Sequence, residues 1–161
     1  MELELLRELF SYDPSTGLLT RRTTRNARNA KAGDVVGTAD SGGYLQVKVD
    51  GKLIAVHRIA FLLYHGWLPD EVDHHNRVRQ NNWISNLRPA TRTQNNGNRS
   101  LNSNNTSGYK GVTRNGKNNS WRAQITLNGA VTYLGSFGSP EEAYAHYKDA
   151  AVAHFGEYAA L

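Results

Sequence analysis

Cysteine is absent from the 161 residues of the chain. Its absence excludes disulfide bonds, cysteine-ligated zinc and thiol catalysis, so any bound metal ion needs oxygen and nitrogen ligands. Long apolar runs are lacking too, since no segment approaches the roughly 18 apolar residues of a membrane span. The first residues, MELELLR, are acidic and amphipathic, unlike the basic start of a secretion signal. We therefore expect an intracellular, cytoplasmic protein that has no membrane partner.

Acidic residues are scarce in the middle of the chain. Overall, 19 Lys and Arg residues stand against 14 Asp and Glu residues, a formal net charge of +5. Residues 21–122 hold 17 basic and 6 acidic residues, a net +11, whereas the two ends together hold 2 basic and 8 acidic ones. A basic region of this kind is a candidate footprint for the phosphates of a nucleic acid. A solvated basic surface is the alternative.

Local patterns in the first half of the chain predict short helices and strands. A helical turn over residues 3–10 leads into a turn that contains Pro14 and Gly17. Apolar and polar residues alternate on both sides of Asp50-Gly51, which predicts a β-hairpin. An apolar face over residues 57–64, followed by a glycine, predicts a helix directly after this hairpin.

Two polar segments lack hydrophobic periodicity. Residues 21–31 are rich in Arg, Asn and Thr and are predicted to form a loop or an arm along a phosphate backbone. Residues 95–105 contain many asparagines and one large apolar residue, Leu101. The later part of this segment, residues 99–105, is the predicted linker between two domains.

The last third of the chain has its own pattern. Residues 121–127 alternate, Asn128-Gly129 is a strong two-residue hairpin signal, and residues 131–134 supply the partner strand. This register places Ala123, Ile125 and Leu127 on one face and leaves an opposite face made of Arg122, Gln124, Thr126 and Tyr133. Ser139-Pro140 is a typical helix start. The segment therefore predicts a small sheet covered by one helix.

The segment around Asp73-His74 has the residue types that phosphodiester hydrolysis requires. Such a reaction needs a base to activate water and a cation to stabilise the charge on the phosphate. The imidazole of His74 titrates near neutral pH and suits the base, and the carboxylate of Asp73 suits Mg²⁺ or Mn²⁺. Taken alone, the pair is better explained as a surface turn with incidental histidines.

Further motifs occur in order around this pair: His57-Arg58 upstream, Asn86-Leu87-Arg88 and Asn95 downstream, and Tyr12-Asp13-Pro14 near the start. Together they resemble the HNH homing endonuclease family of phages and introns over most of residues 1–100. The resemblance implies a ββα-metal core, with His74 as the general base, Asp73 and Asn95 as metal ligands, and Asn86 as the residue that orients the base.

The chain departs from this family at several positions. Val78, Asn81 and Trp83 stand where such proteins usually have Asp, Asp and Arg, and His75 stands where an aliphatic residue is common. We interpret His75 as a phosphate contact or a bystander in preference to a second metal ligand. His57 either packs beside the site or takes part in catalysis. For Asn86 and Asn95 the alternative is turn or cap chemistry.

Residues 106–161 contain four further motifs in order, SGYKGV at 107–112, WRA at 121–123, LGSF at 134–137 and YKDAA at 147–151. Together they resemble the apetala and ethylene-response-factor type of DNA-binding domain. It implies that a three-stranded sheet enters the major groove. By position, the contacts to DNA fall to Lys110, Thr113, Arg122, Gln124, Thr126 and Tyr133. An ordinary solvated strand face is the alternative.

These observations predict an α+β protein with a nuclease domain at residues 1–98, an Asn-rich linker at 99–105 and a DNA-binding domain at 106–161. The predicted function is that of a site-directed, homing-type endonuclease that nicks or cuts double-stranded DNA with Mg²⁺ or Mn²⁺. No protein partner is implied, and a phage-encoded copy would act in the host cytoplasm. The alternative is a non-catalytic DNA-binding regulator with an inactive nuclease-like half. RNA binding ranks third, because no clear aromatic platform is present.

Overall fold

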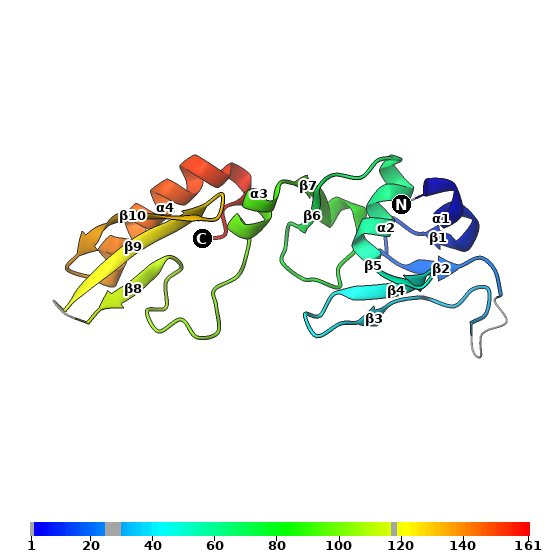
Figure 1. Cartoon of the computed structure of the whole chain (residues 1–161), viewed down its shortest axis with the longest axis horizontal. Coiled ribbons are helices and arrows are strands. Elements are labelled where there is room, and N and C mark those ends of the chain that lie inside the picture. The colour runs from blue at the N-terminus through cyan, green and yellow to red at the C-terminus, as the bar shows by residue number, and fades with distance from the viewer. Residues whose placement is uncertain (1, 25–29, 117–118) are drawn as a thin grey trace. The chain divides into compact units, whose positions relative to one another are not determined.

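A computed structural model describes residues 2–24, 30–116 and 119–161. The chain divides into two compact units, Met1–Ala90 and Thr91–Leu161, which are described separately below (Figure 1). Both units combine helices with small antiparallel sheets, as the α+β prediction requires. Part of the arm predicted at residues 21–31 lies outside the described residues. In the part of the chain that the structure describes, no helix is long and apolar enough to cross a membrane.

The described residues of unit 1 form three small sheets and two α-helices. Its sheets pair β1 with β2, β3 with β4 and β5, and β6 with β7. The elements are α1 (Leu3–Leu9), β1 (Phe10–Tyr12), β2 (Leu19–Arg21), β3 (Thr38–Ala39), β4 (Leu45–Val49), β5 (Lys52–Ala55), α2 (Val56–His65), β6 (Glu71–His74), the 3-10 turn η1 (Ile84–Asn86) and β7 (Leu87–Ala90).

The β4–β5 hairpin and helix α2 form where the sequence predicts them. Asp50 and Gly51 both have positive φ, 46° and 82°, which is the conformation that a tight hairpin turn needs. Helix α2 ends at His65 and is capped by Gly66, which adopts the left-handed conformation and donates its backbone N–H to the carbonyl of Leu62. The buried face of α2, which includes Ile59, packs against the N-terminal segment.

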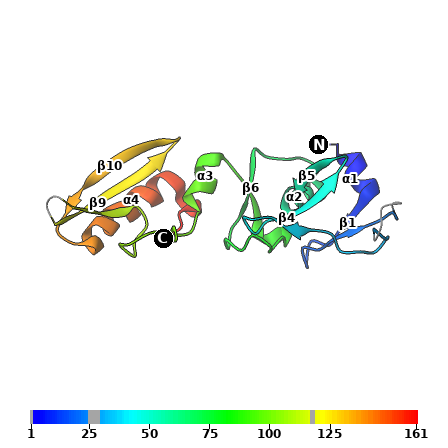
Figure 2. The same cartoon turned by 60° about the horizontal axis from the view of Figure 1, so that its bottom comes forward.

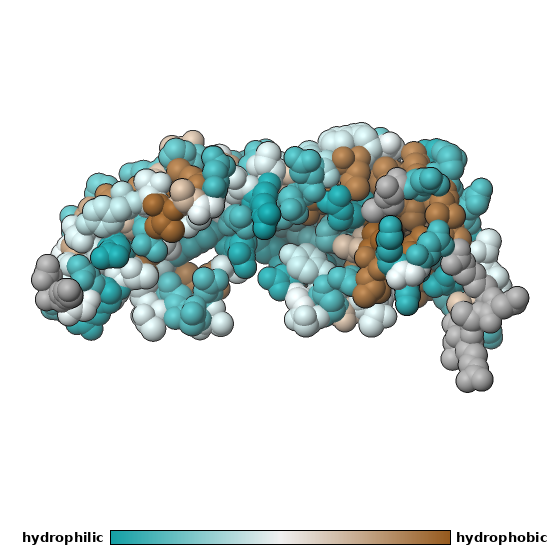
Figure 3. Space-filling model, viewed as in Figure 1, coloured by the Kyte–Doolittle hydropathy of each residue, from teal (hydrophilic) through white to brown (hydrophobic). Residues whose placement is uncertain are grey.

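Helix α2 also supports the β6–β7 hairpin. Its residues Ala60 and Phe61 share an apolar cluster with Val72 of β6 and Leu87 of β7. The hairpin is therefore anchored at its apolar positions, while its polar residues lie between these anchors. In the view of Figure 3, apolar side chains gather over α1 and α2, and the surface around the β6–β7 hairpin is mostly hydrophilic.

Unit 2 is a three-stranded sheet with a long helix along one face (Figure 2). The strand order is β10-β9-β8, and all neighbours are antiparallel. The elements are α3 (Arg92–Gly97), β8 (Val112–Asn115), β9 (Ser120–Leu127), β10 (Ala130–Phe137), α4 (Pro140–Phe155) and the 3-10 turn η2 (Gly156–Tyr158). The predicted turn at Asn128-Gly129 and the predicted helix start at Ser139 are both confirmed.

The two faces of this sheet differ as the sequence predicts. Ala123 and Ile125 are buried, and Ala123 packs with Val112 and with Ala143 of α4. Arg122 and Thr126, which alternate with them along β9, are exposed. A bulge in the pairing between Tyr133 and Gly135 leaves this alternation intact over the turn-proximal half of the hairpin. One face of the sheet is therefore covered by α4, and the other is free of it.

Candidate functional site

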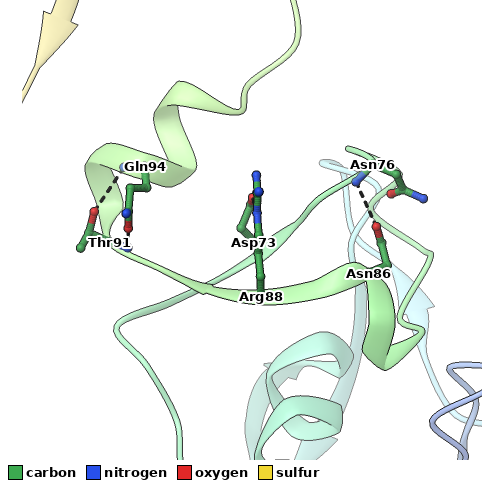
Figure 4. A network of polar contacts seen from close by, with 6 residues as sticks. All are labelled: Asp73, Asn76, Asn86, Arg88, Thr91 and Gln94. Atoms are coloured by element: carbon green, nitrogen blue, oxygen red, sulfur yellow. Dashed lines mark hydrogen bonds and ion pairs between the residues drawn. The ribbon is translucent and has the colours of Figure 1, made fainter. Parts of the chain in front are cut away.

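The β6–β7 hairpin positions the predicted metal ligand Asp73 and the predicted base His74. Asp73 lies opposite Arg88 across the ladder, and His74 lies opposite Leu87. Directly opposed residues on an antiparallel pair project from the same face, so Asp73 and Arg88 meet. The Nε atom of Arg88 lies 2.8 Å from the Oδ2 atom of Asp73, and the Asp73 side chain is only 4 % exposed (Figure 4). The ion pair fixes the orientation of this carboxylate.

His74 is buried beside Asp73 and has a defined partner. Its Nε2 atom lies 3.0 Å from the Oδ1 atom of Asn82, a side chain that is 2 % exposed. An amide oxygen only accepts hydrogen bonds, so Nε2 donates and Nδ1 is the basic nitrogen of the neutral ring. Burial lowers the pKa of His74, against the opposing effects of Asn82 and of the Asp73 charge, with a smaller lowering from Arg79. The ring is therefore neutral at pH 7.

Asn86 holds the loop that carries Asn82. Its Oδ1 atom accepts the backbone N–H of Asn76 at 2.9 Å (Figure 4), and its Nδ2 atom donates to the carbonyl of Asn81 at 2.7 Å. The backbone N–H of His75 donates to the carbonyl of Asn86 at 2.9 Å, and the His75 side chain is exposed. Asn86 thus joins the two ends of the loop, and the side chain that reaches His74 from this loop is Asn82.

Residues of the N-terminal turn also hold this loop in place. The hydroxyl of Tyr12 donates to the carbonyl of Asn82 at 2.7 Å, and the backbone N–H of Ile84 donates to the carbonyl of Pro14 at 3.0 Å. Gly17 has a φ of +72°, and a Cβ atom there would lie 2.6 Å from the carbonyl carbon of Asn82. The sequence marks this segment as a turn, but only the structure reveals that the turn supports Asn82.

Two further rings surround His74. The His57 ring meets it edge to face, with centroids 4.9 Å apart, and the Tyr44 ring lies 5.9 Å away. The Nδ1 atom of His57 is buried without a hydrogen-bond partner. Burial above all, with contributions from His74 and Arg58, lowers the pKa of His57 to about 3. His57 is therefore a neutral ring packed against the predicted base.

Asn95 lies in unit 2. It is on helix α3, which follows β7 directly in the chain and starts with a capping box between Thr91 and Gln94 (Figure 4). The order β6, β7, α3 is the ββα order that the sequence resemblance implies. Gly97 at the end of α3 accepts a hydrogen bond from the backbone N–H of Ala160, so the helix is attached to the C-terminal segment. The unit boundary after Ala90 thus precedes the domain boundary that the sequence predicts at residue 98.

Five of the six predicted DNA contacts share one face of the sheet in unit 2. Thr113 lies opposite Arg122, and Tyr133 lies opposite Gln124. Residues 122, 124 and 126 alternate along β9 and therefore point to the same side. The Arg122 guanidinium lies 5.9 Å from the centre of the Tyr133 ring, and the Tyr133 hydroxyl donates to Ser136 Oγ at 3.0 Å. This free face presents the side chains of Thr113, Arg122, Gln124, Thr126 and Tyr133.

Lys110, the sixth predicted contact, is engaged elsewhere. Its ammonium group donates to the carbonyls of Gly97 and Arg99 at 2.6 and 2.7 Å. These bonds tie the start of the sheet to the end of α3, because Lys110 immediately precedes the glycine that leads into β8. A role for Lys110 at a phosphate stays a prediction.

The comparisons with known proteins agree with the position of this site. Residues 55–97 match a family model described as HNH endonuclease. A protein of Acanthamoeba polyphaga mimivirus, named an uncharacterized HNH endonuclease, is 35 % identical over 117 residues, which are 71 % of this chain. The aligned part spans 60 % of that relative's length.

Proposed function

We propose that this chain, which carries an HNH endonuclease domain at residues 55–97, hydrolyses phosphodiester bonds in double-stranded DNA at a site selected by unit 2. The observation that carries the proposal is the buried His74 ring, which follows Asp73 in strand β6 and is hydrogen-bonded to Asn82. A homing-type, site-directed activity is part of the proposal, as is the dependence on a divalent metal ion.

His74 acts as the general base. With Nε2–H donated to Asn82, the Nδ1 atom of the ring takes a proton from the attacking water. The lowered pKa keeps the ring in this basic form at neutral pH. The neutral His57 ring packs against His74 without adding a charge that would change this state.

The donor atoms suit a hard cation. Asp73 would hold Mg²⁺ or Mn²⁺ through its carboxylate oxygens, the ligand type that these ions prefer, and the role of Asn95 as a second ligand stays a prediction. Among the described residues no three His, Asp or Glu side chains form a closed metal cage. Mg²⁺ is commonly bound by one or two carboxylates, several waters and substrate phosphates, so a single carboxylate fits this ion. When bound, it neutralises charge that grows on the scissile phosphate.

The remaining residues of the site position these groups. Asn86 holds the loop through its hydrogen bond to Asn81, and Tyr12 and Gly17 contact the backbone of Asn82. These contacts fix the position of Asn82, which in turn orients His74. Arg79 donates to the carbonyl of Gly42, and its guanidinium lies 5.1 Å from the centre of the Tyr44 ring. We assign Asn86 a positioning role that acts through the loop.

Unit 2 supplies the DNA-binding face. Its exposed arginine, threonines and tyrosine are of the kinds that contact bases and phosphates in a major groove. The free face is the side of the sheet away from α4.

The decisive experiment is incubation of the full chain with supercoiled plasmid in Mg²⁺, in Mn²⁺ or in EDTA, beside the His74→Ala variant. Metal-dependent nicking or cutting that the variant lacks, with DNA binding retained in EDTA, supports the nuclease. Equal cleavage by His74→Ala contradicts the assignment of His74 as the base. DNA binding without cleavage under either metal supports the alternative, a DNA-binding regulator whose nuclease-like half is inactive.

A further inference from the structure

The segment predicted to be a linker forms one wall of a groove in unit 2. The groove has a volume of about 500 Å³. Its lining residues come from the segment between Arg99 and Thr106, from the start of β8 and from the middle of β9. Tyr147 and Phe155 of helix α4 complete the lining. A flexible tether would leave no such groove, so the segment is part of the folded unit.

Internal hydrogen bonds hold this wall in place. The Asn105 side chain donates to the carbonyl of Tyr109 at 2.9 Å and accepts the backbone N–H of Gly108 at 2.8 Å. The Ser107 hydroxyl donates to the carbonyl of Val112 at 2.8 Å, which links the segment to strand β8. At the other end, the Lys110 ammonium joins the carbonyls of Gly97 and Arg99. The groove is therefore formed before any ligand arrives.

The chemistry of the groove suits an anionic, hydrogen-bonding ligand. Amide side chains line it at Asn96, Asn102, Asn104, Asn105 and Gln124, and hydroxyls line it at Ser100 and at three threonines. Arg99 and Lys110 bring positive charge, and among the lining residues that the structure describes none is acidic. Small-molecule pockets are mostly apolar, whereas phosphate and sugar oxygens are bound by arginine, lysine, amides and hydroxyls.

The groove is continuous with the proposed DNA-binding face. Thr113, Gln124 and Thr126 belong to that face and also line the groove. We infer that the groove binds the sugar-phosphate backbone of duplex DNA next to the base pairs that the sheet contacts. This inference rests on the proposed DNA binding by unit 2 and adds a second contact region to it, formed by the segment between α3 and β8.

The test measures the binding of the full chain to a fluorescent random-sequence DNA duplex in EDTA, between about 50 and 200 mM salt. Arg99→Ala is expected to lower the slope of log affinity against log salt by about 0.9, because one phosphate contact is lost. Arg99→Lys keeps the charge and is expected to keep the slope. The double variant Asn102→Ala and Asn104→Ala is expected to weaken binding roughly fivefold with an unchanged slope, because neutral hydrogen bonds release no counterions.

Two controls separate this inference from the proposed function. Lys148→Ala removes an exposed cation of α4 that does not line the groove, so its slope should match that of the unaltered chain. Arg122→Ala reports on the sheet face alone. Unaltered binding by the Arg99 and asparagine variants, or an equal loss in Lys148→Ala, overturns the groove even where Arg122→Ala still weakens binding. An unaltered chain that does not bind the duplex overturns the proposed DNA binding and the groove together.

Discussion

The Nε2 atom of His74 lies 3.0 Å from the Oδ1 atom of Asn82, and both side chains are buried. Asn82 is held in turn by the hydroxyl of Tyr12, which is 70 residues away in the chain, and by the close approach of Gly17. The orientation of the proposed base therefore depends on a series of contacts that starts at the N-terminal turn. Substitutions at Asn82 and Gly17 therefore test most directly how the proposed base is positioned.

Asn82→Ala should slow cleavage by roughly 100-fold, because a positioned general base contributes about 10²–10⁴ to the rate and the ring loses the bond that orients it. DNA affinity in EDTA should stay unchanged, because Asn82 is buried. The matched control is Gln80→Ala, an exposed position in the same loop. Single-turnover plasmid cleavage measures the rates, and Asn82→Asp, which keeps an acceptor oxygen, should recover part of the rate. A folded Asn82→Ala protein with the unaltered rate would contradict the role of Asn82.

Gly17→Ala should both destabilise unit 1 and impair cleavage. Its φ of +72° disfavours any side chain, and the new Cβ atom would lie 2.6 and 2.7 Å from the backbone of Asn82 and Trp83. Gly66→Ala is the matched control, since Gly66 has a φ of +76° and nothing within 4 Å of a new Cβ atom. We expect about 1 kcal/mol of lost stability at Gly66, from backbone strain alone, and more at Gly17. Urea unfolding of both variants measures the difference, and equal losses would show that the clash with the loop has no effect.

Local signals were sufficient to predict much of the fold. Asp50-Gly51 and Asn128-Gly129 supply the positive φ that tight hairpins need, and Ser139-Pro140 starts a helix with a side-chain cap. Each of these signals acts within a few residues, so the local sequence is enough to predict the turn or helix start that it produces. The face of the sheet that presents Arg122 follows from the same register.

Contacts between distant segments were not predictable in this way. Asn82 and Asn81 are chemically alike and adjacent, and only tertiary packing decides that the Asn82 side chain turns inward to His74. The engagement of Lys110 by Gly97 and Arg99 likewise depends on how α3 packs within unit 2. The buried Nδ1 atom of His57 has no local sequence signal either. The one local signal for these contacts is the N-terminal turn, in which Pro14 and Gly17 fix a backbone shape against which another segment can pack.

Acid should destabilise unit 1 through His57. Its pKa in the folded protein is about 3, against an ordinary value of 6.5, so above pH 6.5 both states are neutral and stability is full. Between pH 6.5 and 3 the unfolded chain binds a proton that the folded chain does not, so stability falls by about 1.4 kcal/mol for each pH unit. From pH 6.5 to 5 the loss is about 2 kcal/mol. Urea unfolding at several pH values measures it, and His57→Phe should make the dependence shallower, with part of the remaining slope due to His74, whose pKa burial also lowers. An equally steep curve for His57→Phe would contradict this origin.

Arg122→Ala should weaken sequence-specific binding and leave the chemistry of unit 1 intact. Arg122 projects from the free face beside Tyr133, so its loss removes a contact that discriminates bases, worth about 1–3 kcal/mol. Arg114→Ala is the matched control, because Arg114 carries the same charge on the same sheet but lies opposite Trp121, whose side chain packs on the α4 side. Selection of preferred duplexes from a random pool, followed by affinity measurements on the selected site, compares the two variants. At high protein concentration both should still cut plasmid in a metal-dependent reaction, since His74 and Asp73 are unchanged.

If Arg114→Ala relaxes site preference as much as Arg122→Ala, then the net charge of unit 2 and not its free face governs recognition. If Arg122→Ala abolishes cutting even at saturating concentration, then the sheet takes part in placing the scissile phosphate as well as in choosing the site.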